Sequence, residues 1–157
     1  MDWIKLKQHV YFEDGSLRDI YVRRMIVDDW QRWIEHANSN GIVKFTLDGV
    51  HIADEIDFAA VSKYWGQPGS EFPSASLTIG NILLQVYFGD ESELELDLSP
   101  QDIQTIDDHR TLMDYLLSVS NLLQKNVELT MENPAAVNEV LLSIRFGEVR
   151  VIQSEIL

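Results

Sequence analysis

Four short turn signals constrain the fold of this chain more than any other feature. Each places a glycine in a two-residue turn between segments rich in β-branched and aromatic residues: Asp14-Gly15, Asp48-Gly49, Gly80-Asn81 and Gly147-Glu148. This pattern is typical of β-hairpins, because glycine readily adopts the positive φ angles of such turns. Parallel strands would need long crossovers, for which there is little room. The sequence therefore predicts an antiparallel sheet.

The predicted strands flank these turns in pairs. They cover residues 9–12 and 17–22, 42–47 and 50–52, 76–79 and 82–88, and 140–146 and 149–152. A further strand is predicted over residues 93–98, where leucine alternates with acidic residues. Alternation with a period of two gives one apolar and one acidic side.

Two main helices are predicted, over about residues 27–38 and 106–125. In the first, Asp28 is the expected N-cap, Trp30 and Trp33 share a face that suits core packing, and Gly41 suits a left-handed exit. The second begins after Thr105 and carries an apolar stripe at helical spacing. Shorter helices are predicted over residues 57–65 and from Ser99-Pro100. We therefore predict an α+β fold of one domain, residues 1–157, with helices packed on an antiparallel sheet.

Negative charge is concentrated in the middle of the chain. The 157 residues have a formal net charge of −14, and residues 51–109 hold 12 acids but a single base, Lys63. A localised negative field steers cationic partners and opposes binding to nucleic acid or an anionic membrane. The basic pair Arg23-Arg24, next to a predicted strand end, is expected to be solvated.

Eight acidic residues are the candidate partner-binding face. They are Asp90, Glu91, Glu93, Glu95, Asp97, Asp102, Asp107 and Asp108. No base lies near them in sequence, so a basic partner could relieve their mutual repulsion. Two other interpretations stay open: the charge serves only solubility, or it protects a strand from edge-to-edge aggregation.

Tests for catalytic and metal chemistry single out no residue. The chain has no glycine-rich phosphate loop, no Gly-x-Ser-x-Gly elbow, no His-Glu-x-x-His motif and no cysteine. His109 follows Asp107 and Asp108, but consecutive helical side chains fan out and cannot converge on a metal. We therefore expect neither a metal nor a cofactor, and no catalytic residue is proposed.

No apolar run approaches the roughly 18 residues that would suggest a membrane span, and no signal peptide is recognisable. We expect a cytoplasmic protein. In size and acidity the chain resembles small immunity and antitoxin-type proteins of bacteria. This resemblance implies direct binding to a basic protein such as a nuclease or another toxin, and it assigns no role to a single residue. The alternatives are an enzyme with a carboxylate or histidine site and a homo-oligomeric structural module.

Overall fold

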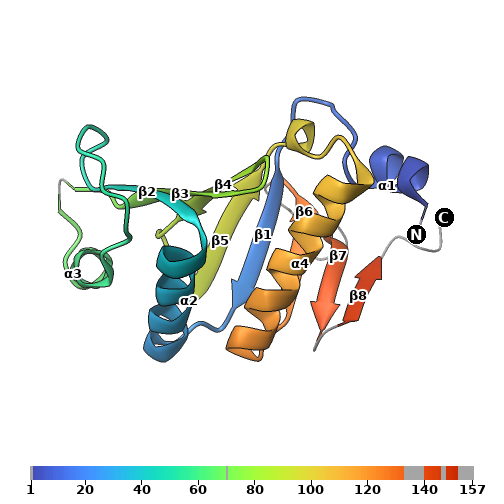
Figure 1. Cartoon of the computed structure of the whole chain (residues 1–157). Coiled ribbons are helices and arrows are strands. Elements are labelled where there is room, and N and C mark those ends of the chain that lie inside the picture. Colours follow the sequence, from blue (N-terminus) through green and yellow to red (C-terminus); the bar gives the residue numbers. More distant parts are fainter. Residues whose placement is uncertain (1, 70, 133–139, 146–147, 152–157) are drawn as a thin grey trace.

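An eight-stranded antiparallel sheet organises the computed structural model, with strand order β2-β3-β4-β5-β1-β6-β7-β8. The structure describes residues 2–69, 71–132, 140–145 and 148–151. The sheet is strongly twisted, as antiparallel sheets of this size are. In Figure 1, β2 and β3 run nearly across the view, whereas β7 and β8 run steeply through it in opposite directions.

The elements follow one another in an order that mixes helices with strands. They are α1 (Trp3–His9), β1 (Arg18–Arg23), α2 (Val27–Asn40), β2 (Ile42–Thr46), α3 (Phe58–Gly66), β3 (Ser74–Ile79), β4 (Ile82–Tyr87), β5 (Glu93–Leu98), the 3₁₀ helix η1 (Pro100–Asp102), α4 (Ile106–Leu123), β6 (Val127–Met131), β7 (Val140–Arg145) and β8 (Glu148–Val151). The predicted α+β class with helices packed on an antiparallel sheet is confirmed.

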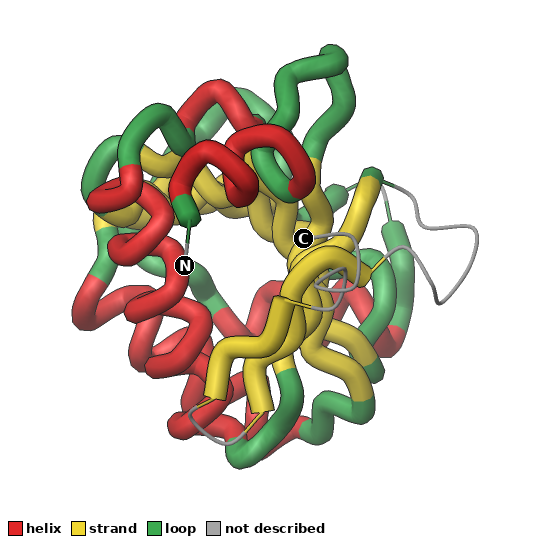
Figure 2. The backbone as a smooth tube through the Cα atoms, turned by 90° about the vertical axis from the view of Figure 1, so that its right-hand side faces the viewer, coloured by secondary structure: helices red, strands yellow, loops and turns green. Residues whose placement is uncertain are grey.

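The two faces of the sheet differ in chemistry. α2 and α4 lie side by side across one face (Figure 1), and all four α-helices contribute buried side chains to one hydrophobic core. Turned by 90°, most helical segments lie to one side of the strands (Figure 2). Ile20, Leu94 and Leu96 point into this core and are at most 1% exposed. We call the opposite face, on which none of the described helices packs, the helix-free face.

Both main helices and both short ones are confirmed. Thr105 caps α4, with its hydroxyl accepting from the Asp108 N–H while the Asp108 carboxylate accepts from the Thr105 N–H. Trp30 and Trp33 of α2 are buried, as predicted. The predicted N-cap of α2, Asp28, is wrong. The N-cap is Ile26, and it is the Asp29 carboxylate that accepts from the Ile26 N–H.

The predicted strand over residues 9–12 is wrong. The segment before it forms α1, which Asp2 caps by accepting from the Ile4 N–H, and residues 10–12 are irregular. The Arg18 guanidinium donates to the carbonyls of Val10 and Phe12 at 2.7 and 2.8 Å. A buried arginine therefore satisfies the carbonyls that a strand partner would otherwise bind.

The predicted strand over residues 50–52 is also wrong. Only an isolated bridge, Phe45 with Ala53, forms after the turn. The Asp48 carboxylate accepts from the N–H groups of Val50 and His51, so a side chain takes the bonds of a returning strand. Gly41 is extended rather than left-handed, and its lack of a side chain instead makes room for Leu77.

The other two predicted hairpins are confirmed by their register. Ile79 pairs with Ile82 across Gly80, whose φ of +55° is the conformation that glycine accommodates. Arg145 pairs with Glu148 in the β7–β8 hairpin, so Glu148 is the first residue of β8 rather than a turn residue as predicted. The turn glycine of that hairpin, Gly147, lies outside the described residues.

Candidate functional site

Carboxylates and tyrosines line up on the helix-free face, across the middle of the sheet. β5 lies between β4 and β1, so Glu95 is opposite both Tyr87 and Tyr21. One row further along, Asp97 is opposite Asp19. Directly opposed residues on one face have Cβ atoms only about 4.5–5.5 Å apart. We call these five residues the carboxylate–tyrosine strip.

Phenol hydroxyls supply the hydrogen bonds of the strip. The Tyr87 hydroxyl donates to Asp97 Oδ2 at 2.6 Å. The Tyr21 hydroxyl lies 3.3 Å from Asp19 Oδ2 and 3.4 Å from Glu95 Oε1. Within the described residues, neither Glu95 nor Asp97 has an ion pair. Among the described residues, Glu95 and Asp97 are therefore contacted by neutral phenol groups and paired with no cation.

Burial and like charges destabilise the ionised strip. Burial raises the pKa of Glu95 above its usual range, and the Asp19 carboxylate raises it further. Burial also raises the pKa of Asp97, against the lowering effect of the Tyr87 hydrogen bond. The pKa values of both tyrosines are raised, mainly by burial. Keeping Glu95 and Asp97 ionised therefore costs free energy when no partner is bound.

Glu93, the third acid of β5, has a different environment. Its carboxylate pairs with the Arg23 guanidinium at 2.5 Å, and the same guanidinium lies 3.7 Å from Glu128 Oε2. The Arg23 side chain also lies over the Tyr21 ring at 4.9 Å. Arg23 is therefore partnered, although its side chain is 55% exposed and the sequence suggested simple solvation.

The remaining predicted acids lie apart from the strip. Asp90 and Glu91 are in the β4–β5 connection, where hydrogen bonds from Ser92 lower the pKa of Asp90. Asp102, in η1, accepts from the N–H of Leu83 in β4. Asp107 pairs with an arginine one turn along α4, and Asp108 caps that helix. The structure thus groups Glu93, Glu95 and Asp97 on the helix-free face and gives Asp90, Asp102, Asp107 and Asp108 local structural contacts.

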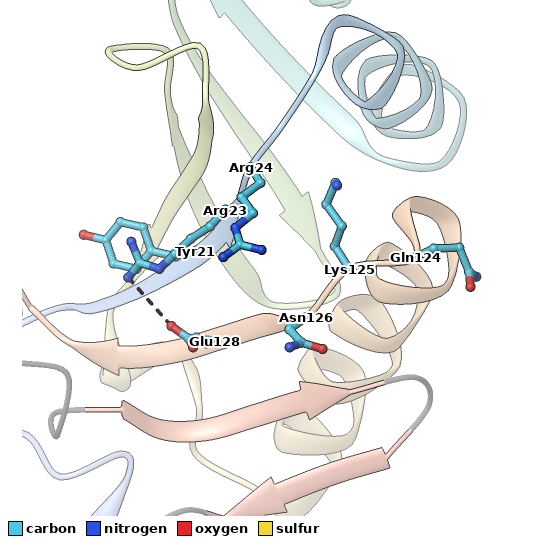
Figure 3. Close-up of a pocket in the computed structure, with 7 residues that line it drawn as sticks. All are labelled: Tyr21, Arg23, Arg24, Gln124, Lys125, Asn126 and Glu128. Atoms are coloured by element: carbon cyan, nitrogen blue, oxygen red, sulfur yellow. Dashed lines mark ion pairs between the residues drawn. The ribbon is translucent and has the colours of Figure 1, made fainter.

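A second polar feature, which we call the basic pocket, adjoins one end of the strip. It is a cavity of about 420 Å³ lined by Tyr21, Arg23, Arg24, Gln124, Lys125, Asn126 and Glu128. The end of β1 forms one side and the α4–β6 connection the other (Figure 3). Tyr21 belongs to both features, so cationic and anionic groups adjoin on one surface.

Sequence reasoning missed Asp19, Tyr21 and Tyr87 of the strip. The odd positions of β1 are all polar or aromatic, so alternation in residues 18–23 could have indicated which side chains share a face. What alternation does not reveal is that β1, far from β5 in sequence, is its neighbour in the sheet.

In the described part of the chain, no group of three or more histidines, aspartates and glutamates is arranged to hold a metal ion. Among the same residues, no helix is long and apolar enough to cross a membrane. No family model matches the chain, and neither a curated protein nor a solved structure matches it.

Proposed function

We propose that this chain is a non-catalytic binding protein whose carboxylate–tyrosine strip receives basic side chains of a partner protein. The observation that carries the proposal is the contrast on β5: Glu93 has an arginine partner, whereas Glu95 and Asp97 have none within the described residues. A lysine or arginine from a partner would give them the charge that Arg23 gives Glu93.

The energetics of the strip support a cationic occupant. The raised pKa values of Glu95 and Asp97 mean that ionisation is less favourable in the folded protein than in the unfolded chain. A positive charge brought to the strip would remove that cost on binding. The free protein thus carries the free-energy cost of repulsion and desolvation, and a cation of the partner would offset that cost in the complex.

The tyrosines support a protein partner rather than a simple cation. Tyrosine is enriched at binding hot spots, because its ring provides contact area and its hydroxyl a hydrogen bond. The Tyr87 side chain is partly open to solvent, at 37% exposed. The overall charge of −14 would speed the approach of a basic protein. We propose that the chain acts in the manner of an immunity or antitoxin-type inhibitor of such a protein.

The proposal is tested by parallel capture on three immobilised forms of the chain. These are the wild type, the strip variant Glu95→Gln with Asp97→Asn, and the control variant Asp54→Asn with Glu55→Gln. Asp54 and Glu55 are exposed and belong to the connection between β2 and α3. Both variants remove two negative charges, so non-specific attraction to basic proteins changes equally.

We expect a basic protein that is retained by the wild type and by the control variant and lost from the strip variant. Its association rate should fall with added salt, and the strip variant should flatten that dependence. A partner held equally by all three forms would overturn the assignment of the strip. If binding of the partner weakened equally in the strip variant and the control variant, net charge rather than the strip would explain the binding.

A homo-oligomeric module is a second candidate, and exposed apolar side chains near the β2 edge of the sheet favour it. Val50, Ile52 and Phe72 are 75%, 65% and 59% exposed. Phe72 donates its N–H to Leu47, so its segment adjoins the start of the connection that holds the other two. Light scattering compares the wild type with the double variant Val50→Ser with Ile52→Ser. If the chain self-associates through this edge, the molar mass measured in solution should be lower for the variant than for the wild type.

A further inference from the structure

Among the described residues, one positive charge of the basic pocket has no ion-pair partner. Arg23 is paired with Glu93 and Glu128. Lys125 Nζ lies 3.5 Å from Oδ2 of Asp29, whose other oxygen, Oδ1, accepts from the Arg32 guanidinium. By contrast, the Arg24 side chain has no ion pair or hydrogen bond to any described residue. In a chain with a net charge of −14, an unpaired arginine that lines a cavity is a specific local feature.

The backbone holds Arg24 in an uncommon conformation. Arg24 and Gln124 are the two non-glycine residues with positive φ in the described part of the chain, at +58° and +54°. Both line the basic pocket. Gln124 ends α4, a position where the left-handed conformation is common. Arg24 has no helix end to explain it, and backbone strain of this kind tends to occur at binding sites.

Neutral donors of the pocket also lack partners. The Asn126 side chain has no hydrogen bond to any described residue. Figure 3 shows the Arg24 guanidinium turned toward the α4–β6 connection, from which Lys125 and Asn126 project. Gln124, whose side chain donates to the Asn121 carbonyl, points away from this group. Arg24 and Asn126 therefore provide donors without a partner among the described residues, and Lys125, which pairs with Asp29, lines the same pocket.

We propose that the basic pocket binds one oxyanion, a phosphate or carboxylate group, between Arg24, Lys125 and Asn126. Guanidinium and ammonium groups form their strongest hydrogen bonds with such anions, and an amide N–H can complete the set. The cavity volume of about 420 Å³ is in the range of small-molecule sites. This site has the opposite charge preference to the carboxylate–tyrosine strip and does not depend on the proposed function.

A simpler account competes with this proposal. The C-terminal end of α4 carries partial negative charge, which nearby cations stabilise without any ligand. In that account, replacing Arg24 changes stability but no anion binds. The test must therefore follow the anion rather than stability alone.

The test is an NMR titration of the isotope-labelled full chain with sodium phosphate and, separately, with sodium acetate, at constant ionic strength maintained with chloride. The variants are Arg24→Gln and the control Arg110→Gln, which removes an exposed arginine from α4. We expect saturable shifts at the amides of Arg24, Lys125 and Asn126, with binding at least about tenfold weaker in Arg24→Gln and unchanged in Arg110→Gln.

Saturation by phosphate alone or acetate alone would support the site and identify the source of the oxyanion. The absence of localised shifts in the wild type with either anion would overturn the proposal, whether or not the variant folds. Equal binding by wild type and Arg24→Gln would also overturn it. None of these outcomes bears on capture by the strip, so the two proposals fail separately.

Discussion

The two faces of the sheet place alternate residues of the same strands in opposite environments. On β5, Leu96 packs in the core beneath α2 and α4, while its neighbours Glu95 and Asp97 lie in a half-buried row of like charges. The face that the helices cover, which we call the covered face, stabilises the fold, since its apolar groups are removed from water. The helix-free face is arranged against stability, since it confines carboxylates that repel one another. Such a cost is typical of a surface whose groups act on another molecule.

The largest expected effect is on the covered face. Leu96→Ala should lower the free energy of unfolding by about 2–5 kcal/mol, because it leaves a cavity in a packed core. Urea denaturation followed by tryptophan fluorescence measures the loss. Leu83→Ala is the matched control, because Leu83 is 50% exposed and should cost within about 0.5 kcal/mol. Equal losses in the two variants would remove the distinction between the faces.

A smaller effect concerns the buried hydrogen bond between α4 and the segment after α1. The Tyr11 hydroxyl lies 2.7 Å from His109 Nδ1, and both side chains are buried. Tyr11→Phe should cost roughly 1–3 kcal/mol, because the histidine nitrogen loses its partner away from water. Tyr64→Phe is the control, since the Tyr64 hydroxyl has no hydrogen bond among the described residues. A neutral Tyr11→Phe would show that water reaches His109.

The same histidine predicts a pH dependence of definite sign. Burial lowers the pKa of His109 from 6.5 to about 4, so the unfolded chain binds a proton more readily in that interval. The contribution of His109 to stability is therefore complete above pH 6.5 and is lost as the pH falls toward 4. His109→Gln should flatten the stability profile between these values relative to wild type.

The smallest effect is expected on the helix-free face, and its sign is opposite. Glu95→Gln should raise the free energy of unfolding at pH 7 by about 0.5 kcal/mol, because it removes a repelled, half-buried charge. Because the pKa of Glu95 is raised in the folded protein, its penalty grows as the pH rises through that pKa. The gain from Glu95→Gln should therefore disappear in acid, where the wild-type side chain is protonated.

Parallel thermal melts of wild type, Glu95→Gln and Glu55→Gln measure this difference. Glu55 is exposed, so Glu55→Gln should leave the melting temperature nearly unchanged. A destabilised Glu95→Gln variant would mean that the carboxylate supports the sheet rather than burdens it. The proposed function would then lose its energetic argument.

Local signals accounted for much of the fold. The Thr105 cap and apolar stripe predicted α4, and Gly80 predicted the β3–β4 hairpin, because these signals act between residues close in sequence. The failures at residues 9–12 and 50–52 have one cause. In both, a side chain, Arg18 or Asp48, binds the backbone groups that a strand partner was expected to bind.

The candidate site shows the same distinction between features set by nearby residues and features set by distant ones. Alternation on β5 was sufficient to predict that Glu93, Glu95 and Asp97 share a face, because side-chain direction in a strand is a local property. The partners of these acids depended on the pairing of β5 with β1 and β4. That pairing brings Arg23 to Glu93, and it places Asp19 and the two tyrosines around Glu95.

The sequence by itself therefore determined the class of fold, the long helix, two hairpins and the acidic side of β5. Only the tertiary structure decided which acids are neutralised, which stay charged, and that Arg24 and Asn126 meet at one pocket. The physical reason is range: caps, turns and alternation act over a few residues. Strand order, burial and charge pairing depend on contacts between segments distant in sequence, which form only when the sheet assembles.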